Sequence, residues 1–286
     1  MDRFLLDAGP SERGWHQFET AARCLRLWAL NHQEHIKFPV SEPLVKGSLL
    51  HIGLAHYYEI KKLAASGGDV ESIYEPIDAV RELARQEATK ASRSGDTPIA
   101  NLWQSAIPTV CSALDEYMLT YHNCGWRVLE VERELRAHIP KLDSDETFLF
   151  TQRADLIVED TQGFKWIVDH KSCYRITSKT LRQYTLSGQF LGYQVFGRKM
   201  YGKKFGGVIL NRVTLSNSFE VDRSCLEPAP AAVASFIPML QQTEQRIDTW
   251  KHLEDPMMYP PVFSDQVCFG KYGACSAFEL CRWGRE

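Results

Sequence analysis

Apolar residues recur every three to four positions through the first part of the chain, which is the period of a helix with one buried face. The pattern covers residues 14–32 and then 45–66. Two more helices are expected over about 73–93 and 99–123, separated by the turn-forming sequence RSGDTP. The sequence therefore predicts a mainly helical part up to residue 124.

Beyond residue 124 the pattern becomes that of β-strands. Four segments rich in β-branched and aromatic residues are separated by turn-like sequences. The segment between the third and fourth strands has helical periodicity and is long enough to connect two parallel strands in a right-handed crossover. We therefore expect an α/β protein with a three-stranded meander, a crossover, a fourth strand and a last helix over about 229–253. The expected strands cover residues 125–139, 147–159, 164–172 and 205–215.

Composition limits the class of protein. The chain has 286 residues, of which 44% are hydrophobic and 24% charged, as in an ordinary globular protein. No apolar run approaches the roughly 20 residues of a membrane span, and the N-terminus lacks the basic and apolar regions of a signal peptide. We therefore expect a cytoplasmic protein without membrane association. In that reducing compartment, eight cysteines favour metal binding over disulfide bonds.

Charge is unevenly distributed along the chain. The net charge is −3, but residues 165–204 contain nine basic residues and one acidic residue. Such a basic segment is typical of a surface that binds a polyanion, although a solvated helix face produces the same pattern. Within this segment we predict Arg175, Lys179 and Arg182 as nucleic-acid contacts.

Charged residues also interrupt the second and third predicted strands. Asp169 and Lys171 are two residues apart, so their side chains emerge on the same face, and Asp155 comes beside Asp169 if the two strands pair. Neighbouring carboxylates repel unless a cation lies between them, and oxygen ligands suit Mg²⁺ or Mn²⁺. A lysine beside such a cation can orient a water and balance charge on a phosphate. The set fits metal-assisted phosphodiester hydrolysis, although a cross-strand Asp–Lys ion pair would use the same residues.

Motifs in a fixed order carry a family resemblance. The segments KGSLLHIGLAHYYE, IVDHKS and GQFLGYQ, with Asp155 before the second, resemble the PD-(D/E)XK nuclease superfamily, and more closely its RecB-like branch, which includes CRISPR-associated adaptation nucleases and phage-encoded exonucleases. The resemblance implies a restriction-endonuclease-like mixed sheet flanked by helices. It implies a single nuclease domain over 1–286, with a helical part at 1–124, a nuclease core at 125–215 and a C-terminal helix and cysteine tail at 216–286.

The resemblance also implies roles for residues at the centre of this core. Asp155 and Asp169 would be metal-binding carboxylates and Lys171 the catalytic lysine. The main-chain carbonyl of His170 would complete the coordination, while its side chain is the variable position of the motif. His51 would be a further metal ligand from an N-terminal helix.

Three other groups need separate interpretation. His56 lies on the same predicted helix as His51 and is a competing candidate for the metal ligand. Gln189 and Tyr193 form a Q-x-x-x-Y motif on one helix face, and the resemblance implies catalytic roles in which they hold the lysine and contact the DNA backbone. The glutamates of the first strand alternate, so we expect them to point one way, on a solvated face or at the edge of the site, and not to be ligands. They are Glu130, Glu132 and Glu134.

Three of the eight cysteines lie close together in the tail, at Cys268, Cys275 and Cys281. Cys24 stands where cluster-bearing members of the branch carry a distant fourth cysteine, and this arrangement resembles their [4Fe–4S] site, with four thiolate ligands. Such a site would staple the tail to the N-terminal helix. The usual tail spacing is C-x2-C-x5-C, whereas the first gap here is six residues. Zinc held by the same thiolates and ordinary buried thiols are the alternatives.

Together these features predict a divalent-metal-dependent DNA nuclease. Exonuclease action on DNA ends, in recombination, repair or phage DNA processing, is favoured because many stand-alone relatives of the branch are exonucleases. The alternative is a DNA-binding or auxiliary subunit of a recombination or CRISPR-adaptation complex, with weak or partner-dependent nuclease activity. A structural protein that holds a cluster or zinc is a third interpretation, against which the basic segment weighs.

Overall fold

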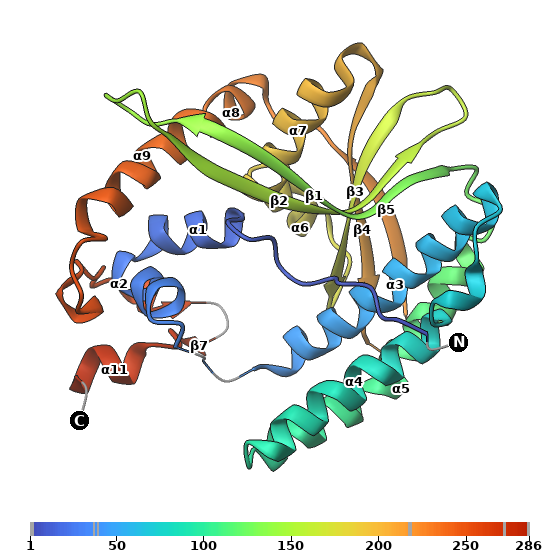
Figure 1. Ribbon diagram of the computed structural model, residues 1–286, viewed down its shortest axis with the longest axis horizontal. Helices are drawn as coiled ribbons and strands as arrows, with labels where there is room; N and C mark the ends of the chain where they lie inside the picture. Colours follow the sequence, from blue (N-terminus) through green and yellow to red (C-terminus); the bar gives the residue numbers. More distant parts are fainter. Residues whose placement is uncertain (1–2, 37, 39, 217–218, 271–272, 285–286) are drawn as a thin grey trace. The chain divides into compact units, whose positions relative to one another are not determined.

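The computed structural model describes residues 3–36, 38, 40–216, 219–270 and 273–284 (Figure 1). The chain divides into two compact units, each assembled from three stretches of sequence. A single domain over 1–286 thus stays a prediction. Unit 1 comprises Met1–Pro10, Val40–Leu135 and Arg153–Ala229, and unit 2 comprises Ser11–Pro39, Arg136–Gln152 and Pro230–Glu286.

A five-stranded mixed sheet has the strand order β1-β2-β3-β4-β5. Strand β3 pairs antiparallel with β2 and parallel with β4, and β4 pairs antiparallel with β5. The predicted α/β class and the parallel strand after the crossover are therefore confirmed. The fifth strand is absent from the sequence prediction, because VDRSCL alternates too weakly to stand out. The strands are β1 (Arg127–Pro140), β2 (Thr147–Glu159), β3 (Lys165–Cys173), β4 (Phe205–Thr214) and β5 (Val221–Leu226).

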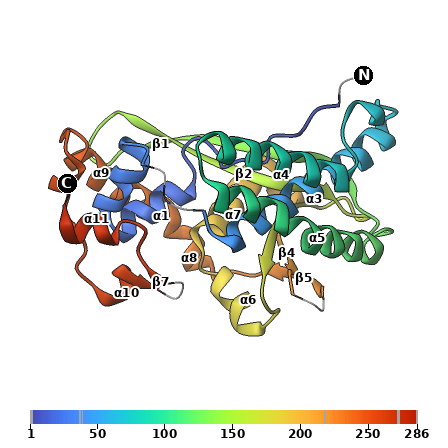
Figure 2. The ribbon, with the colours of Figure 1, turned by 90° about the horizontal axis from the view of Figure 1, so that it is seen from below.

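The helical part of unit 1 follows the predicted pattern closely. Helix α3 (Glu42–Ser66) ends at Gly67, whose φ of 72° is a left-handed conformation that glycine adopts without strain. Helices α4 (Pro76–Arg93) and α5 (Thr97–Thr120) lie side by side (Figure 2), and the Asp96 carboxylate caps α5 by accepting from the Ile99 N–H. A short 3₁₀ turn, η2 (Val70–Ser72), precedes α4.

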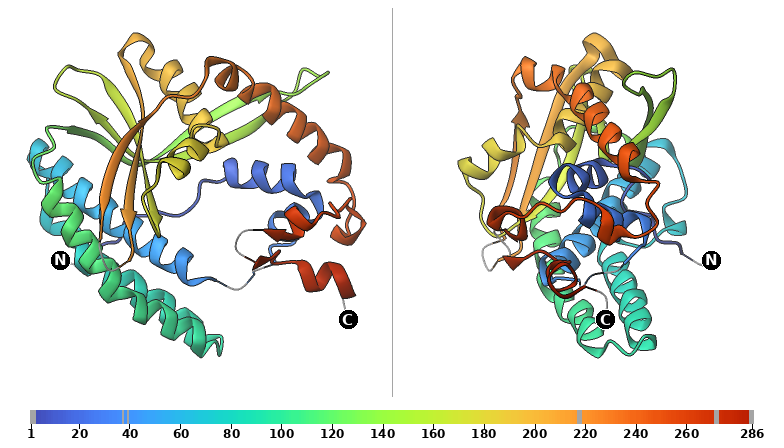
Figure 3. Two further views of the ribbon diagram at one scale, coloured as in Figure 1. Left: turned by 180° about the vertical axis from the view of Figure 1, so that it is seen from behind. Right: turned by 90° about the vertical axis from the view of Figure 1, so that its left-hand side faces the viewer.

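Helices cover both faces of strands β3 and β4 (Figure 3). Apolar side chains of the sheet pack with α3, α4 and α5 in one buried core, which includes Leu54, Leu114 and Val168. The opposite face contacts α7 (Gly188–Tyr201), which follows α6 (Ser178–Tyr184) and leads through η3 (Gly202–Lys204) into β4. At Gly197 an added Cβ would overlap the Phe205 ring, so glycine lets α7 approach the sheet closely. The two faces of β3 therefore have different neighbours, α3 on one side and α7 on the other.

Unit 2 contains the remaining helices. The single helix expected over 14–32 is broken at Cys24, whose backbone is extended, with φ −161° and ψ 115°. Here Leu25 and Trp28 pack with Ile247 and Tyr259 in a small core. Among the described residues, no helix is long and apolar enough to cross a membrane. The elements are α1 (Trp15–Arg23), α2 (Leu25–Trp28), the π-helix η1 (Ala29–Gln33), α8 (Pro230–Ala234), α9 (Phe236–Trp250), η4 (Pro256–Met258), α10 (Asp265–Cys268), β6 (Phe269–Gly270), β7 (Gly273–Ala274) and α11 (Phe278–Trp283).

Candidate active site

The pairing of β2 with β3 brings the two predicted aspartates together. Leu156 pairs with Val168, so the same register places Asp155 opposite Asp169. The main-chain N–H of His170 donates to Asp155 Oδ2 at 2.6 Å. The exposed fractions of Asp155 and Asp169 are 8% and 0%. Because burying an unpaired carboxylate is costly, two buried acids side by side indicate a functional site.

Asp169 is held from three directions. Lys171 Nζ lies 2.6 Å from its Oδ2, and the Gln189 side-chain amide donates to its Oδ1 at 2.7 Å. The Tyr193 hydroxyl lies 3.2 Å from the same Oδ1 and donates to the main-chain carbonyl of Arg153 at 2.5 Å. The Q-x-x-x-Y pair of α7 thus contacts the Asp169 carboxylate, and a contact of the pair with the lysine stays a prediction.

Helix α3 brings His51 to the second aspartate. His51 Nδ1 lies 3.4 Å from Asp155 Oδ2. One turn earlier, at Gly47, an added Cβ would stand 3.3 Å from the Ser172 hydroxyl of β3, so the glycine allows the helix to lie this close. The competing candidate, His56, is buried elsewhere. Its Nε2 accepts from the Leu6 N–H at 3.1 Å and its Nδ1 lies 2.9 Å from a carbonyl oxygen, so its ring links α3 to neighbouring segments.

Glu132 is the site residue that the sequence analysis left out. Single ligand atoms of His51, Glu132 and Asp155 all lie within 4.8 Å of one another, an arrangement suited to one metal ion. Glu132 has a φ of 50°, which is rare for a non-glycine residue and interrupts the alternation of β1. Glu130 instead lies near enough to Tyr201 of α7 to affect its pKa, which is raised by burial and then by the Glu130 carboxylate. The alternation that would point all three glutamates one way, to a solvated face or to the edge of the site, is therefore interrupted at Glu132. Nothing in their spacing indicates this left-handed residue.

Electrostatics shows how strongly these acids interact. Burial, with the Asp169 charge adding, raises the pKa of Asp155 to about 6, although His51 and Lys171 oppose the rise. Burial and then Asp155 raise the pKa of Glu132 well above its usual range. Burial alone would lower the pKa of Lys171, but the two aspartates outweigh it and the pKa is raised. Carboxylates that resist ionisation side by side fit a divalent cation, which would compensate their charge.

The His170 side chain emerges on the opposite face of β3 from Asp169 and Lys171, with its ring centroid 6.2 Å from that of His51. Its ring stacks on Tyr58 with centroids 5.8 Å apart, and its Nδ1 lies 2.8 Å from the Asn211 amide nitrogen. Arg223 donates to the hydroxyls of Tyr58 and Tyr117 at 2.8 and 2.9 Å. Burial lowers the pKa of His170 well below its usual value, so the imidazole is neutral. The side chain therefore anchors β3 in the core, and ligation by its carbonyl stays a prediction.

The three predicted nucleic-acid contacts are all exposed. Lys179 and Arg182 lie on α6, directly after β3. The guanidinium of Arg175 lies over the Tyr174 ring, 5.5 Å from its centroid. Their exposure is compatible with DNA binding, and the contacts themselves stay a prediction.

The cysteines of the predicted cluster all lie in unit 2. Cys24, Cys275 and Cys281 share one small apolar cluster with Leu27 and Leu30. Burial raises the pKa of the Cys281 thiol, and the Cys24 and Cys275 thiols add to the rise. The described cysteines are free thiols. Their sulfurs do not form a group within 4.8 Å: in the part of the chain that the structure describes, the metal-ligand group named above is the only one that does.

The unusual gap before Cys275 has a structural explanation. Phe269 pairs with Ala274, and Gly270 with Gly273, so these residues form the small hairpin of β6 and β7. At its base the Cys275 N–H donates to the Cys268 carbonyl at 2.7 Å. The longer spacing therefore still leaves the main chains of these two cysteines side by side. By residue type alone, four thiols match the ligands of a thiolate-bound cluster or zinc.

Comparisons with known proteins identify the family and the fold of this chain. Residues 15–282 match the sequence model of a family described as the PD-(D/E)XK nuclease superfamily. A crystal structure of a presumptive exonuclease from Eubacterium rectale has a TM-score of 0.54 and 15% identity, covering 96% of this chain and 88% of that chain. The solved structure of SSO0001 has a TM-score of 0.34 and 17% identity, covering 56% of this chain and 70% of that chain. No curated protein matches the chain. At these identities the first structure supports the fold alone, and the TM-score of the second is too low to support a shared fold.

Proposed function

Because the chain belongs to the PD-(D/E)XK nuclease superfamily, we propose that it is a divalent-metal-dependent DNA exonuclease that acts on DNA ends. The observation that carries the proposal is the convergence of His51, Glu132 and Asp155 within 4.8 Å. Beside them, Lys171 and Asp169 form an ion pair at 2.6 Å. A carboxylate-rich cation site next to a lysine is suited to hydrolysis of a phosphodiester.

Three residues of the site would hold a cation, and Lys171 would contact the phosphate. His51, Glu132 and Asp155 would hold Mg²⁺ or Mn²⁺, and the imidazole donor favours Mn²⁺ of the two. When bound, the cation supplies a Lewis acid that polarises the phosphate and lowers the pKa of water. The raised pKa of Lys171 keeps its ammonium charged, which suits it to stabilise negative charge that develops on the phosphate. Asp169 lies outside the group of three and positions that ammonium, and its own contact with the cation stays a prediction.

Cleavage of linear but not circular DNA tests the proposed reaction. We expect the purified protein with Mn²⁺ to degrade end-labelled linear DNA and to leave covalently closed circular DNA intact, because an exonuclease requires an end. Chelation of the metal should stop degradation. Electrophoresis of the products measures both. Linearised circles would overturn exonuclease action in favour of endonuclease action, and intact linear DNA with Mn²⁺ would contradict the nuclease proposal itself.

We also propose a [4Fe–4S] cluster on Cys24, Cys268, Cys275 and Cys281. Support comes from the common apolar surroundings of three of these thiols and from the hairpin that places the fourth beside Cys275. A cluster would link the end of α1 to α10 and α11, elements that are otherwise short. Zinc on the same thiolates is the alternative.

Replacing Cys281 should remove the cluster. We expect anaerobically purified protein to contain iron and to show the broad visible absorption of iron–thiolate charge transfer, and Cys281→Ser to lose both because one of four ligands is gone. Cys225→Ser, which changes an exposed thiol of β5, is the matched control and should keep them. Zinc in place of iron, without visible absorption, would refute the iron–sulfur assignment.

A further inference from the structure

A cavity of about 730 Å³ opens at the carboxyl ends of the parallel strands β3 and β4. One wall is formed by residues 174–177, which lead from β3 to α6. The other is formed by residues 214–216 and by Glu220, between β4 and β5. This volume is in the range of cavities that hold a small ligand, and the carboxyl ends of parallel strands are where α/β sheets commonly bind ligands.

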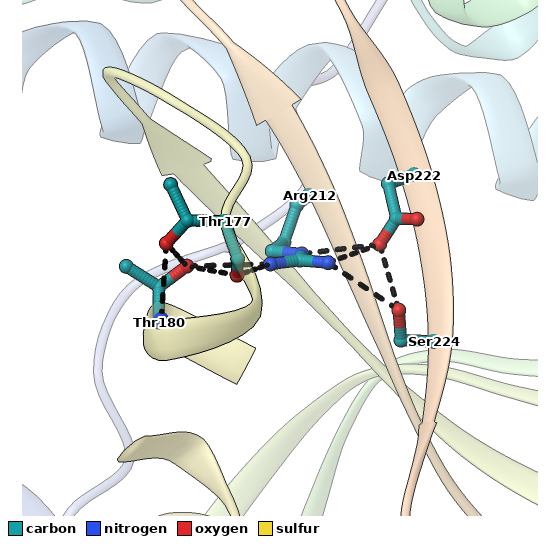
Figure 4. A network of polar contacts seen from close by, with 5 residues as sticks. All are labelled: Thr177, Thr180, Arg212, Asp222 and Ser224. Atoms are coloured by element: carbon teal, nitrogen blue, oxygen red, sulfur yellow. Dashed lines mark hydrogen bonds and ion pairs between the residues drawn. The ribbon is translucent and has the colours of Figure 1, made fainter. Parts of the chain in front are cut away.

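A buried arginine fixes the first wall in place (Figure 4). Arg212 of β4 is 3% exposed, and its Nη1 donates to the Thr177 carbonyl at 2.9 Å and to Thr180 Oγ1 at 3.3 Å. On the other side its Nη2 and Nε donate to Asp222 Oδ2 of β5, at 2.6 and 3.1 Å, and Ser224 donates to the same oxygen at 2.8 Å. The start of α6 is therefore tied to β4 and β5, so the cavity is preformed.

The same arginine relates the cavity to the candidate active site. Arg212 pairs in register with Lys171, so both side chains emerge on the same face of the sheet. Tyr174 follows Lys171 by three residues, at most about 10 Å along an extended chain. A polymer bound at the lysine would thus reach the cavity within a few nucleotides, since successive bases of a stacked strand are about 3.4 Å apart.

The lining has the chemistry of a site for one nucleotide. The Tyr174 side chain is 76% exposed, so its ring is accessible to a planar ligand. The Arg175 guanidinium, 5.5 Å from the centre of that ring, adds a positive charge beside it. An accessible aromatic ring next to a cation is how proteins hold unpaired bases and their phosphates. Glu220, on the opposite wall, offers an acceptor for the amino group of a base.

We propose that this cavity binds an unpaired nucleotide of the DNA strand, with its base stacked on Tyr174 and its phosphate near Arg175. The inference rests on the proposed function, because a nuclease that acts on ends must hold a strand beside its catalytic residues. It goes further because it assigns a second binding site, which none of the proposed catalytic residues lines. A free nucleotide has the same chemistry as one within a strand, so the experiment separates these two sources.

Stacking can be measured without cleavage. A single-stranded oligonucleotide carrying 2-aminopurine is titrated with the protein in the presence of a chelator, and quenching of its fluorescence reports stacking. We expect Tyr174→Ala to lose the quenching and to weaken binding by about 5- to 150-fold, the range for one stacked base. Tyr174→Trp should retain both. Arg175→Ala should weaken binding and lower its dependence on salt by about one phosphate contact.

The control is Phe263→Ala, which removes a ring that is 88% exposed but does not line the cavity, and it should bind like the wild type. Unchanged quenching in Tyr174→Ala overturns the inference, even if the protein degrades DNA. Competition by free deoxynucleoside monophosphate at the affinity of the strand also overturns it, because the site would then take free nucleotides. If the wild type binds no DNA, the proposed function fails as well.

Discussion

Lys171→Ala is expected to reduce DNA cleavage by about 10³-fold, the magnitude typical of removing a positioned charged group from a transition state. The ammonium lies 2.6 Å from Asp169 and its pKa is raised, so it is charged and fixed beside the acids. Gln189 and Tyr193 still contact Asp169 in the variant, and the fold should therefore persist. Initial rates on end-labelled linear DNA with Mn²⁺ give the measurement.

Lys165→Ala provides the matched control. Lys165 lies at the other end of the same strand, with the same 25% side-chain exposure as Lys171 and an ion pair of the same length, 2.6 Å, to Glu159. It should cleave at close to the wild-type rate. Thermal unfolding of both variants tests whether the loss comes from unfolding. If Lys171→Ala cleaves as fast as Lys165→Ala, the lysine is not catalytic.

Glu132→Gln is expected to weaken Mn²⁺ binding by at least about 100-fold, because removing even a group that supports a metal ligand costs about 10- to 100-fold. The substitution keeps the size of the side chain and replaces the carboxylate of one of the three grouped ligands with a neutral amide, which is a weaker metal ligand. It also relieves repulsion with Asp155, so we expect no loss of stability. Calorimetric titration with Mn²⁺ measures the affinity, and cleavage at saturating metal measures what remains.

Glu130→Gln tests whether loss of any glutamate of β1 weakens Mn²⁺ binding. Glu130 is two residues away on the same strand and is not one of the three grouped ligands. It should bind Mn²⁺ as the wild type does. Equal affinity in the Glu130 and Glu132 variants would exclude Glu132 from the metal site and leave Asp155 and His51 as its members.

Much of the site follows from the sequence because it depends on local geometry. Asp169 and Lys171 share a face since side chains alternate along any strand, and a short turn makes β2 and β3 pair, which brings Asp155 beside them. Gln189 and Tyr193 share a helix face for a similar reason. Their contact with Asp169, however, depends on how α7 packs on the sheet, which their spacing does not show.

Other members of the site could not be predicted from spacing. Glu132 joins the other metal ligands because it adopts a left-handed conformation inside a strand. Such a conformation is strained, so surrounding contacts must stabilise it. His56 matches the pattern of a ligand as well as His51 does, but hydrogen bonds to segments far along the chain keep its ring away.

By itself the sequence determined the α/β class, the order of the elements, and the acids and lysine that belong together, because hydrophobic period and side-chain alternation are properties of a few consecutive residues. The tertiary structure decided which histidine and which glutamate join the aspartates, and that a buried arginine shapes a cavity beside them. Those choices depend on packing between segments that are distant in sequence. Contacts of that kind leave no periodic trace in a single chain.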